Sequence, residues 1–275
     1  MGHMFDLVTA DPQHAFSERA LVAAMLRQEA AVAQAQASLG LMAGHDAQSI
    51  ISTCKVDLFD VPQIIRDSML TPFTSNGEPP IIKSLRDSVR LFNPQAAAAV
   101  YRLGQPQDLL DNALALLTQD VLALLHTDVM ARSQHPEAAH LLQSWRRVEL
   151  AASHALCVRL SARQDDTAVP TPALQHEVGK TLGLAVAEAP QREAWMSLGA
   201  ELGVLALCAQ RWAASRGGAS LTPSRTPLWV AQWLTELSHD AGAGEVGRDF
   251  WRVEFPLWST LVIHAIQSVR QIPLK

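Results

Sequence analysis

Three long runs of helical periodicity constrain the fold of this chain more than any other feature of its sequence. They extend from Gln107 to about Arg132, from Pro136 to about Gln164 and from Gln191 to Ser215. Each is longer than the roughly 12 residues of an average helix. Helices of this length need other helices to cover their apolar faces. The sequence therefore predicts a bundle of long, roughly antiparallel helices, which two further segments near 228–239 and 256–272 extend.

Composition points to the same fold class. Hydrophobic residues make up 48% of the chain, and tyrosine occurs once. Ala and Leu dominate and runs of β-branched residues are short, which favours helix over sheet. We therefore expect an all-α protein. The break at Gly104-Gln105-Pro106 predicts two domains, a small N-terminal helical domain over residues 1–104 and a long-helix bundle over residues 105–275.

Cap and turn residues divide the expected N-terminal domain into short helices. Ser17 is a suitable N-cap for the first helix, and Gly40 is a suitable residue just past its end. Further helices are expected near 60–70, 81–92 and 94–103. The segment 71–80 holds three prolines and an Asn-Gly pair, which predicts a loop of the kind that often carries function.

Charge and hydropathy exclude two classes of partner. The formal net charge is −5, and the 22 basic residues are scattered singly apart from Arg146-Arg147. Nucleic-acid-binding proteins gather such residues into stripes along the phosphates, so we expect no nucleic-acid partner. No apolar run approaches the roughly 20 residues of a membrane span, and no signal segment is evident. We expect no membrane association.

The cysteines indicate the cellular compartment of the protein, and the histidines indicate whether it binds a metal. Cys54, Cys157 and Cys208 are far apart and lie in apolar, helix-like settings, typical of free thiols in a reducing compartment. We expect a cytoplasmic protein. The ten histidines include no pair at i, i+4 spacing, so we expect no metal site. Motifs that bind phosphates or dinucleotides are missing as well, and we expect no cofactor.

Several segments follow one another in the order of a known family. Those near the start are Phe16-Ser17-Glu18-Arg19-Ala20, Met25-Leu26-Arg27-Gln28-Glu29-Ala30-Ala31 and residues 34–41. They are followed by Asn76, Ile81-Ile82-Lys83-Ser84-Leu85, Gln107-Asp108-Leu109-Leu110-Asp111-Asn112-Ala113-Leu114, the glycine-rich loop 217–227 and Trp251-Arg252-Val253-Glu254-Phe255-Pro256. Together they resemble the motifs of 3-carboxy-cis,cis-muconate cycloisomerases, which belong to the aspartase/fumarase superfamily. The loop is similar to the signature G-G-S-S-T-M-P-H-K-R-N-P.

The resemblance implies the all-α architecture of that superfamily. It places a remnant of the signature loop at residues 216–227 of the long-helix bundle. The chain is short for the family, so we expect shortened bundle helices and no C-terminal domain. Because the superfamily's bundle helices pack between subunits into a tetramer, and because the run from Gln191 to Ser215 is apolar on several faces, we expect a homo-oligomer. Shortened helices supply less contact area, which favours a dimer over a tetramer.

The resemblance also says what the site requires. In the superfamily, Thr, Ser, Asn and Lys side chains hold a substrate carboxylate, a loop serine acts as base in many members, and histidines assist proton transfer. Negative charge develops on an enolate-like species, which needs preorganised donors and a cation. Here the family's H-W-G-A-T-S-Q-D aligns with residues 101–108, so Tyr101 replaces the histidine and Gln105-Pro106 replaces Thr-Ser. In the loop, Ala219 replaces the catalytic serine and Arg225 the lysine.

The matching positions still leave candidates for each role. The candidate catalytic residues are His135, displaced by one position from the family's motif, and Ser220. The candidate substrate-binding residues are Arg132, Arg225, Asp108, Lys83 and Asn76. Each type has a structural alternative: a helix-terminal histidine in solvent, loop hydroxyls that serve turns and caps, and an aspartate favoured by the dipole of a helix's first turn.

Two functions therefore remain open. The first is a diverged lyase or cycloisomerase that acts on or binds a small polycarboxylate, and its support is the resemblance. The second is a non-catalytic homologue that serves as an assembly or regulatory subunit, and its support is the replaced serine positions and the short chain. A fold does not fix a function.

Overall fold

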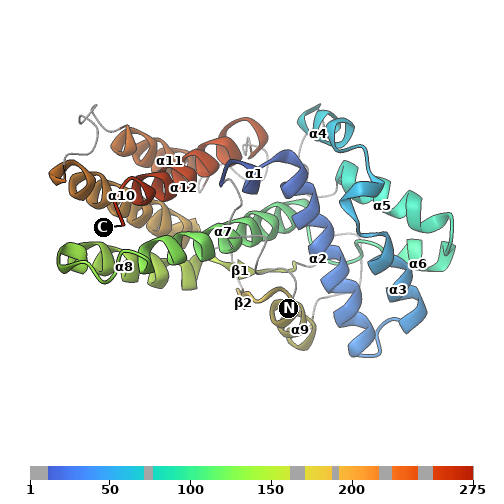
Figure 1. The fold of residues 1–275 in the computed structure, drawn as a ribbon. Coiled ribbons are helices and arrows are strands. Elements are labelled where there is room, and N and C mark those ends of the chain that lie inside the picture. Colours follow the sequence, from blue (N-terminus) through green and yellow to red (C-terminus); the bar gives the residue numbers. More distant parts are fainter. Residues whose placement is uncertain are drawn as a thin grey trace. The chain divides into compact units, whose positions relative to one another are not determined.

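The computed structural model describes residues 12–70, 77–161, 171–187, 192–216, 225–240 and 250–274. The described residues are almost entirely helical (Figure 1), which confirms the all-α fold class. The helices are α1 (Pro12–Ala15), α2 (Glu18–Ser38), α3 (Gly44–Thr53), α4 (Val61–Leu70), α5 (Pro80–Arg90), α6 (Pro94–Ala99), α7 (Pro106–Met130), α8 (Ala139–Ala155), α9 (Pro172–Leu182), α10 (Arg192–Ser215), α11 (Thr226–Asp240) and α12 (Phe255–Arg270). Short helical turns are η1 (Val56–Leu58), η2 (Pro136–Ala138) and η3 (Phe250–Glu254). Strands β1 (Cys157–Val158) and β2 (Ala185–Val186) pair in parallel.

The chain divides into two compact units that are discontinuous in sequence. Unit 1 comprises residues 1–16, 118–155 and 191–275, and unit 2 comprises residues 17–117 and 156–190. The helix α7 contributes its residues up to Leu117 to unit 2 and those from Thr118 to unit 1. The domains expected at 1–104 and 105–275 follow a different division, and they stay a prediction.

In unit 2, α2 packs against α3 and α9. Ser17 caps this helix as predicted, since its Oγ accepts a hydrogen bond from the N–H of Ala20 at 3.2 Å. Gly40 follows the helix with φ of +70°, a conformation that glycine adopts without strain. Leu21 and Leu26 on the helix are almost completely buried. The predicted first helix therefore forms part of the core of this unit.

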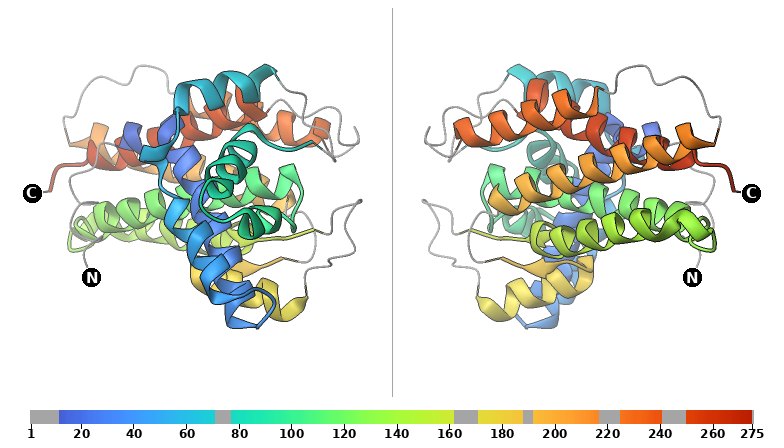
Figure 2. Two further views of the ribbon diagram at one scale, coloured as in Figure 1. Left: turned by 90° about the vertical axis from the view of Figure 1, so that its right-hand side faces the viewer. Right: turned by 90° about the vertical axis from the view of Figure 1, so that its left-hand side faces the viewer.

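In unit 1, α10 packs against α8, α11 and α12, and it lies alongside α8 in both Figure 1 and the right-hand view of Figure 2. Gly199 and Gly203 allow α11 to approach closely. A Cβ atom at Gly199 would overlap the indole of Trp233, and one at Gly203 would overlap the side chain of Val230. Trp233 is completely buried and packs on Trp258 with ring centroids 4.6 Å apart. The two glycines therefore set the spacing between α10 and α11.

Two helices end earlier than their periodicity predicts. The helix α8 ends at Ala155 rather than near Gln164, and the chain continues into β1. The helix α6 ends at Ala99 rather than near Leu103. Tyr101, just beyond it, has φ of +58°, a left-handed conformation that costs a non-glycine residue about 1–2 kcal/mol. Neither α3 nor α9 was predicted from the sequence.

The helix α7 also corrects an expectation about hydropathy. Among the described residues it is the one helix long and apolar enough to cross a membrane, with a mean hydropathy of 1.3 over an 18-residue window. However, 61% of that window is buried inside the structure. A soluble protein's core helix passes the same test, so length and composition alone give weak support for a membrane span.

Candidate functional site

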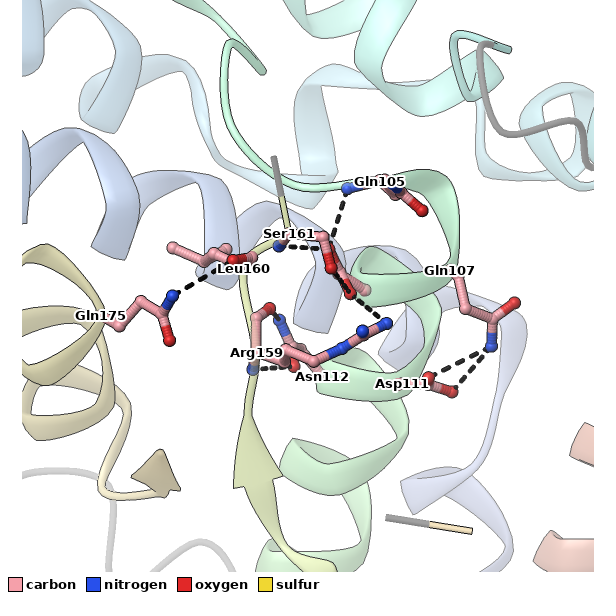
Figure 3. A network of polar contacts seen from close by, with 9 residues as sticks. Gln105, Gln107, Asp111, Asn112, Arg159, Leu160, Ser161 and Gln175 are labelled. Atoms are coloured by element: carbon pink, nitrogen blue, oxygen red, sulfur yellow. Dashed lines mark hydrogen bonds and ion pairs between the residues drawn. The ribbon is translucent and has the colours of Figure 1, made fainter. Parts of the chain in front are cut away.

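Asp108 lies in the first turn of α7, and its side chain is completely buried. Its Oδ2 accepts hydrogen bonds from the backbone N–H groups of Gln105 at 2.9 Å and Ser161 at 2.7 Å. Its Oδ1 accepts a hydrogen bond from the Ser161 hydroxyl at 3.2 Å and lies 2.7 Å from Nη2 of Arg159. Figure 3 shows these three partners converging from the start of α7 and from the segment after β1. The carboxylate thus links the start of α7 to the segment after β1 through hydrogen bonds and an ion pair.

The surroundings of Asp108 suit an ionised carboxylate that is closed to solvent. Burial raises the pKa of Asp108, while the Arg159 guanidinium and the two backbone N–H groups oppose that rise. All of these neighbours are hydrogen-bond donors, whereas a protonated carboxyl group would need an acceptor for its proton. Asp108 therefore has the partners of a structural residue.

Asn112, one turn along α7, extends the same contact. Its Nδ2 donates to the carbonyl of Arg159 at 2.8 Å, and its Oδ1 accepts from the N–H of Arg159 at 3.0 Å (Figure 3). Gln175 on α9 donates to the carbonyl of Leu160 at 3.3 Å. Neither the partners of Asp108, Arg159 and Ser161, nor the contact of Asn112 with the backbone of Arg159 was predicted from the sequence. The spacing of Asp108 and Asn112, four residues apart on one helix face, was the signal for a shared partner.

Arg132 follows α7 and is buried against the end of α12. Its Nε donates to the carbonyl of Ile272 at 2.9 Å, and its Nη2 donates to the carbonyl of Arg270 at 3.1 Å. Its Nη1 donates to the carbonyl of Asp128 at 2.7 Å. Burial lowers the pKa of Arg132, yet arginine stays charged in proteins. The guanidinium therefore caps carbonyl groups at the end of a helix, where the dipole favours a cation.

His135 lies within three residues of Arg132 but belongs to a different cluster. Its N–H donates to the carbonyl of Arg132 at 3.2 Å, while its ring packs on Trp212 with centroids 5.2 Å apart. Its Nδ1 accepts from the N–H of Glu137 at 3.2 Å, and its Nε2 contacts the Arg216 guanidinium. Trp212 Nε1 also donates to Glu137 at 2.9 Å. His135 is thus held at the turn between α7 and α8 by four neighbours.

The remaining predicted site residues are exposed or lie outside the described residues. Lys83 is exposed on α5, and Arg225 is exposed just before α11. Asn76 and Ser220 fall outside the described residues. None of the described candidates lines the pocket between α8 and α10. Their assignment as catalytic or substrate-binding residues stays a prediction.

His264 on α12 forms a polar cluster that the sequence analysis missed. Its Nε2 lies 2.7 Å from the Thr226 hydroxyl on α11 and 2.8 Å from Nε2 of Gln210 on α10. Gln210 also donates to the hydroxyl of Ser268 at 3.0 Å. Trp229 packs edge-on against the imidazole with centroids 4.6 Å apart. Burial lowers the pKa of His264. No sequence motif distinguishes these residues, because they come from three helices.

Metal and thiol chemistry find little support in the described part of the chain. No group of three or more His, Cys, Asp or Glu residues there has an arrangement that could hold a metal ion. Cys54, Cys157 and Cys208 are free thiols. Burial raises the pKa of Cys54, and the charge of Glu29 raises it further. A thiol with a raised pKa is a poor nucleophile because the thiolate is the reactive form.

No protein-family model matches the chain. Over 128 residues it is 30% identical to 3-carboxy-cis,cis-muconate cycloisomerase of Pseudomonas putida, a match that covers 46% of this chain and 30% of the relative. Over 115 residues it is 31% identical to nitrosuccinate lyase of Streptomyces davaonensis, covering 42% of this chain and 24% of the relative. The matches thus span less than a third of the length of these curated relatives.

Solved structures match over nearly the whole chain. A 3-carboxy-cis,cis-muconate lactonizing enzyme from Pseudomonas putida has a TM-score of 0.78 at 17% identity, covering 98% of this chain and 76% of the other. A fumarate lyase from Mesorhizobium sp. BNC1 has a TM-score of 0.68 at 17% identity, covering 95% and 73%. At these identities the likeness shows the fold. Together with the matches to curated relatives, this fold supports placing the chain in the aspartase/fumarase (fumarate lyase) superfamily.

Proposed function

We propose that this protein is a non-catalytic relative of the superfamily's lyases and cycloisomerases, and that it acts as a self-assembling helical subunit. The observation that supports the proposal is that the Arg132 side chain is bound to backbone carbonyl groups. Its guanidinium donates to three backbone carbonyl groups, those of Ile272, Arg270 and Asp128. Three of its five N–H groups thus bind carbonyl groups of α7 and of the end of α12, and the side chain is buried, so turning the guanidinium toward a substrate carboxylate would break some of these bonds. A buried carbonyl left without a donor is unfavourable.

The replaced motif positions agree with this proposal. By resemblance, Tyr101, Pro106 and Ala219 stand where the family has a histidine, a hydroxyl and the loop base. Loss of a catalytic base typically removes about 10²–10⁴-fold in rate. Loss of one donor to the developing oxyanion removes about 10²–10³-fold more. Asp108, which resembles a motif residue of the family, is enclosed by Arg159 and Ser161.

A diverged lyase or cycloisomerase is the second candidate, and two exposed cations favour it. Lys83 and Arg225 are open to solvent, so each is accessible to a carboxylate. The names of the matched relatives, a muconate cycloisomerase and a nitrosuccinate lyase, suggest a small polycarboxylate as the ligand class.

An activity assay tests the proposal directly. With 3-carboxy-cis,cis-muconate as substrate, we expect turnover several orders of magnitude below that of a complete family member. The substitution Ala219→Ser alone should not restore it, because the other positions remain replaced. A wild-type rate close to that of a complete enzyme would refute the proposal.

Arginine-to-lysine substitutions separate the two candidates. Arg132→Lys should lower the free energy of unfolding by about 1–3 kcal/mol, because lysine cannot reproduce the fork that reaches several carbonyls. Arg225→Lys at an exposed position is the matched control and should stay within about 0.5 kcal/mol. A thermal-shift screen against di- and tricarboxylates completes the test. Stabilisation of the wild type by one of them, lost in Lys83→Met or Arg225→Met, would favour the second candidate.

A further inference from the structure

The pocket between α8 and α10 of unit 1 has a volume of about 740 Å³. Small-molecule sites in proteins usually have volumes of about 300–1,000 Å³. Leu141 on α8 and Leu207 on α10 supply apolar lining. Leu141 is almost completely buried, and Leu207 is half-buried. The pocket therefore has the size and the apolar wall to hold the hydrocarbon part of a small molecule.

The helices α8 and α10 run antiparallel on the two sides of this pocket. Nε of Arg147 on α8 lies 3.0 Å from Oε2 of Glu201 on α10. Further along α10, Nε1 of Trp212 donates at 2.9 Å to Oε2 of Glu137, which precedes α8. Residue numbers thus rise along α8 as they fall along α10. Because side chains on a helix lean toward its N-terminus, side chains at opposite ends of the pocket can lean toward each other.

The charges around the pocket leave one guanidinium available. Arg147 is engaged in the ion pair described above, and Glu137 lies 3.6 Å from Nε of Arg216. Arg211 also lines the pocket and is exposed, and it forms no ion pair with any residue that the structure describes. His140 lines the same pocket and adds a positive charge only when it is protonated. The pocket therefore offers the cation of Arg211 to an anion.

Ser144 on α8 gives the pocket a buried hydroxyl group. The residue is 5% exposed and lines the pocket. Its hydroxyl forms no hydrogen bond with any residue in the described part of the chain. A hydroxyl group that is withdrawn from water without a partner is unfavourable. A ligand in the pocket that accepts a hydrogen bond would supply the missing partner.

The positions of Ser144 and Arg211 let both side chains reach one ligand group. Since Trp212 contacts Glu137, Ser144 and Arg211 are separated by about six residues of α8, or about 9 Å along the helix axis. The two side chains lean toward each other from antiparallel helices. A long arginine side chain covers most of this distance, so that a carboxylate between the two residues meets both donors.

We propose that this pocket binds a small amphipathic monoanion, namely a carboxylate on an aliphatic or aromatic body. The Arg211 guanidinium and the Ser144 hydroxyl hold the carboxylate, and the apolar body packs on Leu141 and Leu207. A di- or tricarboxylate would bring further charges to apolar walls that offer them no partner. The ligand class thus differs from the polycarboxylates that the names of the relatives suggest. The inference goes beyond the proposed function and does not rest on it, because it uses residues of one copy.

Calorimetric titration of the full chain with octanoate tests the charge. Octanoate should bind more tightly than 1-octanol, which has the same chain without a charge, and more tightly than succinate. Arg211→Gln should weaken octanoate binding about three- to tenfold and leave 1-octanol binding unchanged. Arg146→Gln removes an exposed arginine of α8 that does not line the pocket, and this matched control should bind octanoate like the wild type. Absence of octanoate binding, or equal losses in the two variants, would overturn the proposal.

The substitution Ser144→Ala tests the hydroxyl. It should weaken octanoate binding about two- to tenfold, because one hydrogen bond to the carboxylate is lost. It should not lower the free energy of unfolding without ligand, because the hydroxyl has no partner to lose in the described structure. Urea unfolding checks this second expectation. Unchanged octanoate affinity in Ser144→Ala would overturn the placement of the carboxylate.

Cys208 locates the site without any substitution. It is a free thiol that lines the pocket and is half-buried. Octanoate should slow the alkylation of Cys208 by iodoacetamide, as followed by mass spectrometry of peptides. The alkylation of Cys157, a half-buried thiol of unit 2, should stay unchanged. Octanoate binding that leaves the rate at Cys208 unchanged would place the ligand elsewhere and overturn the proposal.

Discussion

His264 joins three helices of unit 1 through one ring nitrogen. Its Nε2 lies within hydrogen-bonding distance of the Thr226 hydroxyl and the Gln210 amide. Both groups have a proton to donate, so this nitrogen acts as the acceptor and the ring proton is assigned to Nδ1. Protonation of Nε2 would place an N–H group against the Gln210 amide and put a charge in a half-buried site. The neutral imidazole therefore fits the folded structure better.

This preference predicts a pH dependence of stability. Burial lowers the pKa of His264 in the folded chain, whereas the unfolded chain keeps a value near about 6.5. At pH values between the folded and the unfolded pKa, the unfolded state binds more protons than the folded state. The free energy of unfolding therefore rises with pH in this range. The contribution of His264 is present above about pH 6.5 and is lost as the pH falls toward the lowered pKa. Urea unfolding at a series of pH values measures it.

The substitution His264→Gln removes the titrating group from this cluster. The difference in unfolding free energy between wild type and His264→Gln should shrink as the pH falls below about 6.5. His176→Gln on α9 is a matched control at an exposed position, and its difference from wild type should change little. A difference for His264→Gln that stays constant across the pH range would contradict the assignment.

The positions of the charged candidates could be predicted from the sequence, but their partners could not. Asp108 and Arg132 were selected because they fall at positions that resemble the family's motifs. The carbonyl acceptors of Arg132 at Arg270 and Ile272 lie 138 and 140 residues further along the chain. The backbone donor of Ser161 lies 53 residues from Asp108. Only the tertiary fold brings these groups together, so local sequence cannot show whether a charge faces a ligand or a helix end.

At the scale of elements, cap chemistry explains which helices the sequence predicts. Ser17 and Gly40 bound α2 where expected because both serve as caps. The helix α3 begins at Gly44 without a side-chain cap, and therefore has no start signal. The helix α9 does carry signals, since the Thr171 hydroxyl accepts from the N–H of Leu174 and Gly183 has φ of +70°. The helix α9 was nevertheless not predicted from the sequence, although these signals were present.

The contact between α10 and α11 leads to a prediction about glycine. Gly199→Ala adds a methyl group that would overlap the indole of Trp233. This indole cannot move aside easily, because it is completely buried and its Nε1 donates to the carbonyl of Trp195 at 3.2 Å. Overpacking of this kind costs about 1–3 kcal/mol, which outweighs the gain of roughly 1 kcal/mol in helix propensity. Chemical denaturation should therefore show net destabilisation.

Gly44→Ala is the matched control for that substitution. A Cβ atom at Gly44 would meet nothing within 4 Å, and the residue is the first of α3. Alanine there should be neutral or stabilising by up to about 1 kcal/mol. Equal effects of the two substitutions would show that the close approach of Trp233 to α10 does not limit stability.

At the scale of the whole molecule, apolar side chains remain on the outer faces of the α8–α10 pair. Leu150 on α8 is 61% exposed and Val204 on α10 is 41% exposed. Other positions of α10, such as Leu198, Leu202 and Leu205, are completely buried within unit 1. A helix that is apolar on several faces is stable when several faces are covered. These exposed apolar residues are ones that a second copy would cover in the self-assembling subunit proposed above.

Coupling of folding to association makes stability depend on chain concentration. If the folded bundle is a dimer and the unfolded chain is a monomer, mass action favours the dimer as concentration rises. Each tenfold increase adds about 1.4 kcal/mol to the apparent free energy of unfolding per mole of dimer. We therefore expect the wild-type midpoint of thermal unfolding to rise between about 1 and about 100 μM chain. Calorimetry at several concentrations measures this change. A wild-type midpoint independent of concentration would mean that the exposed residues of α8 and α10 tolerate solvent, and that one chain folds without a partner.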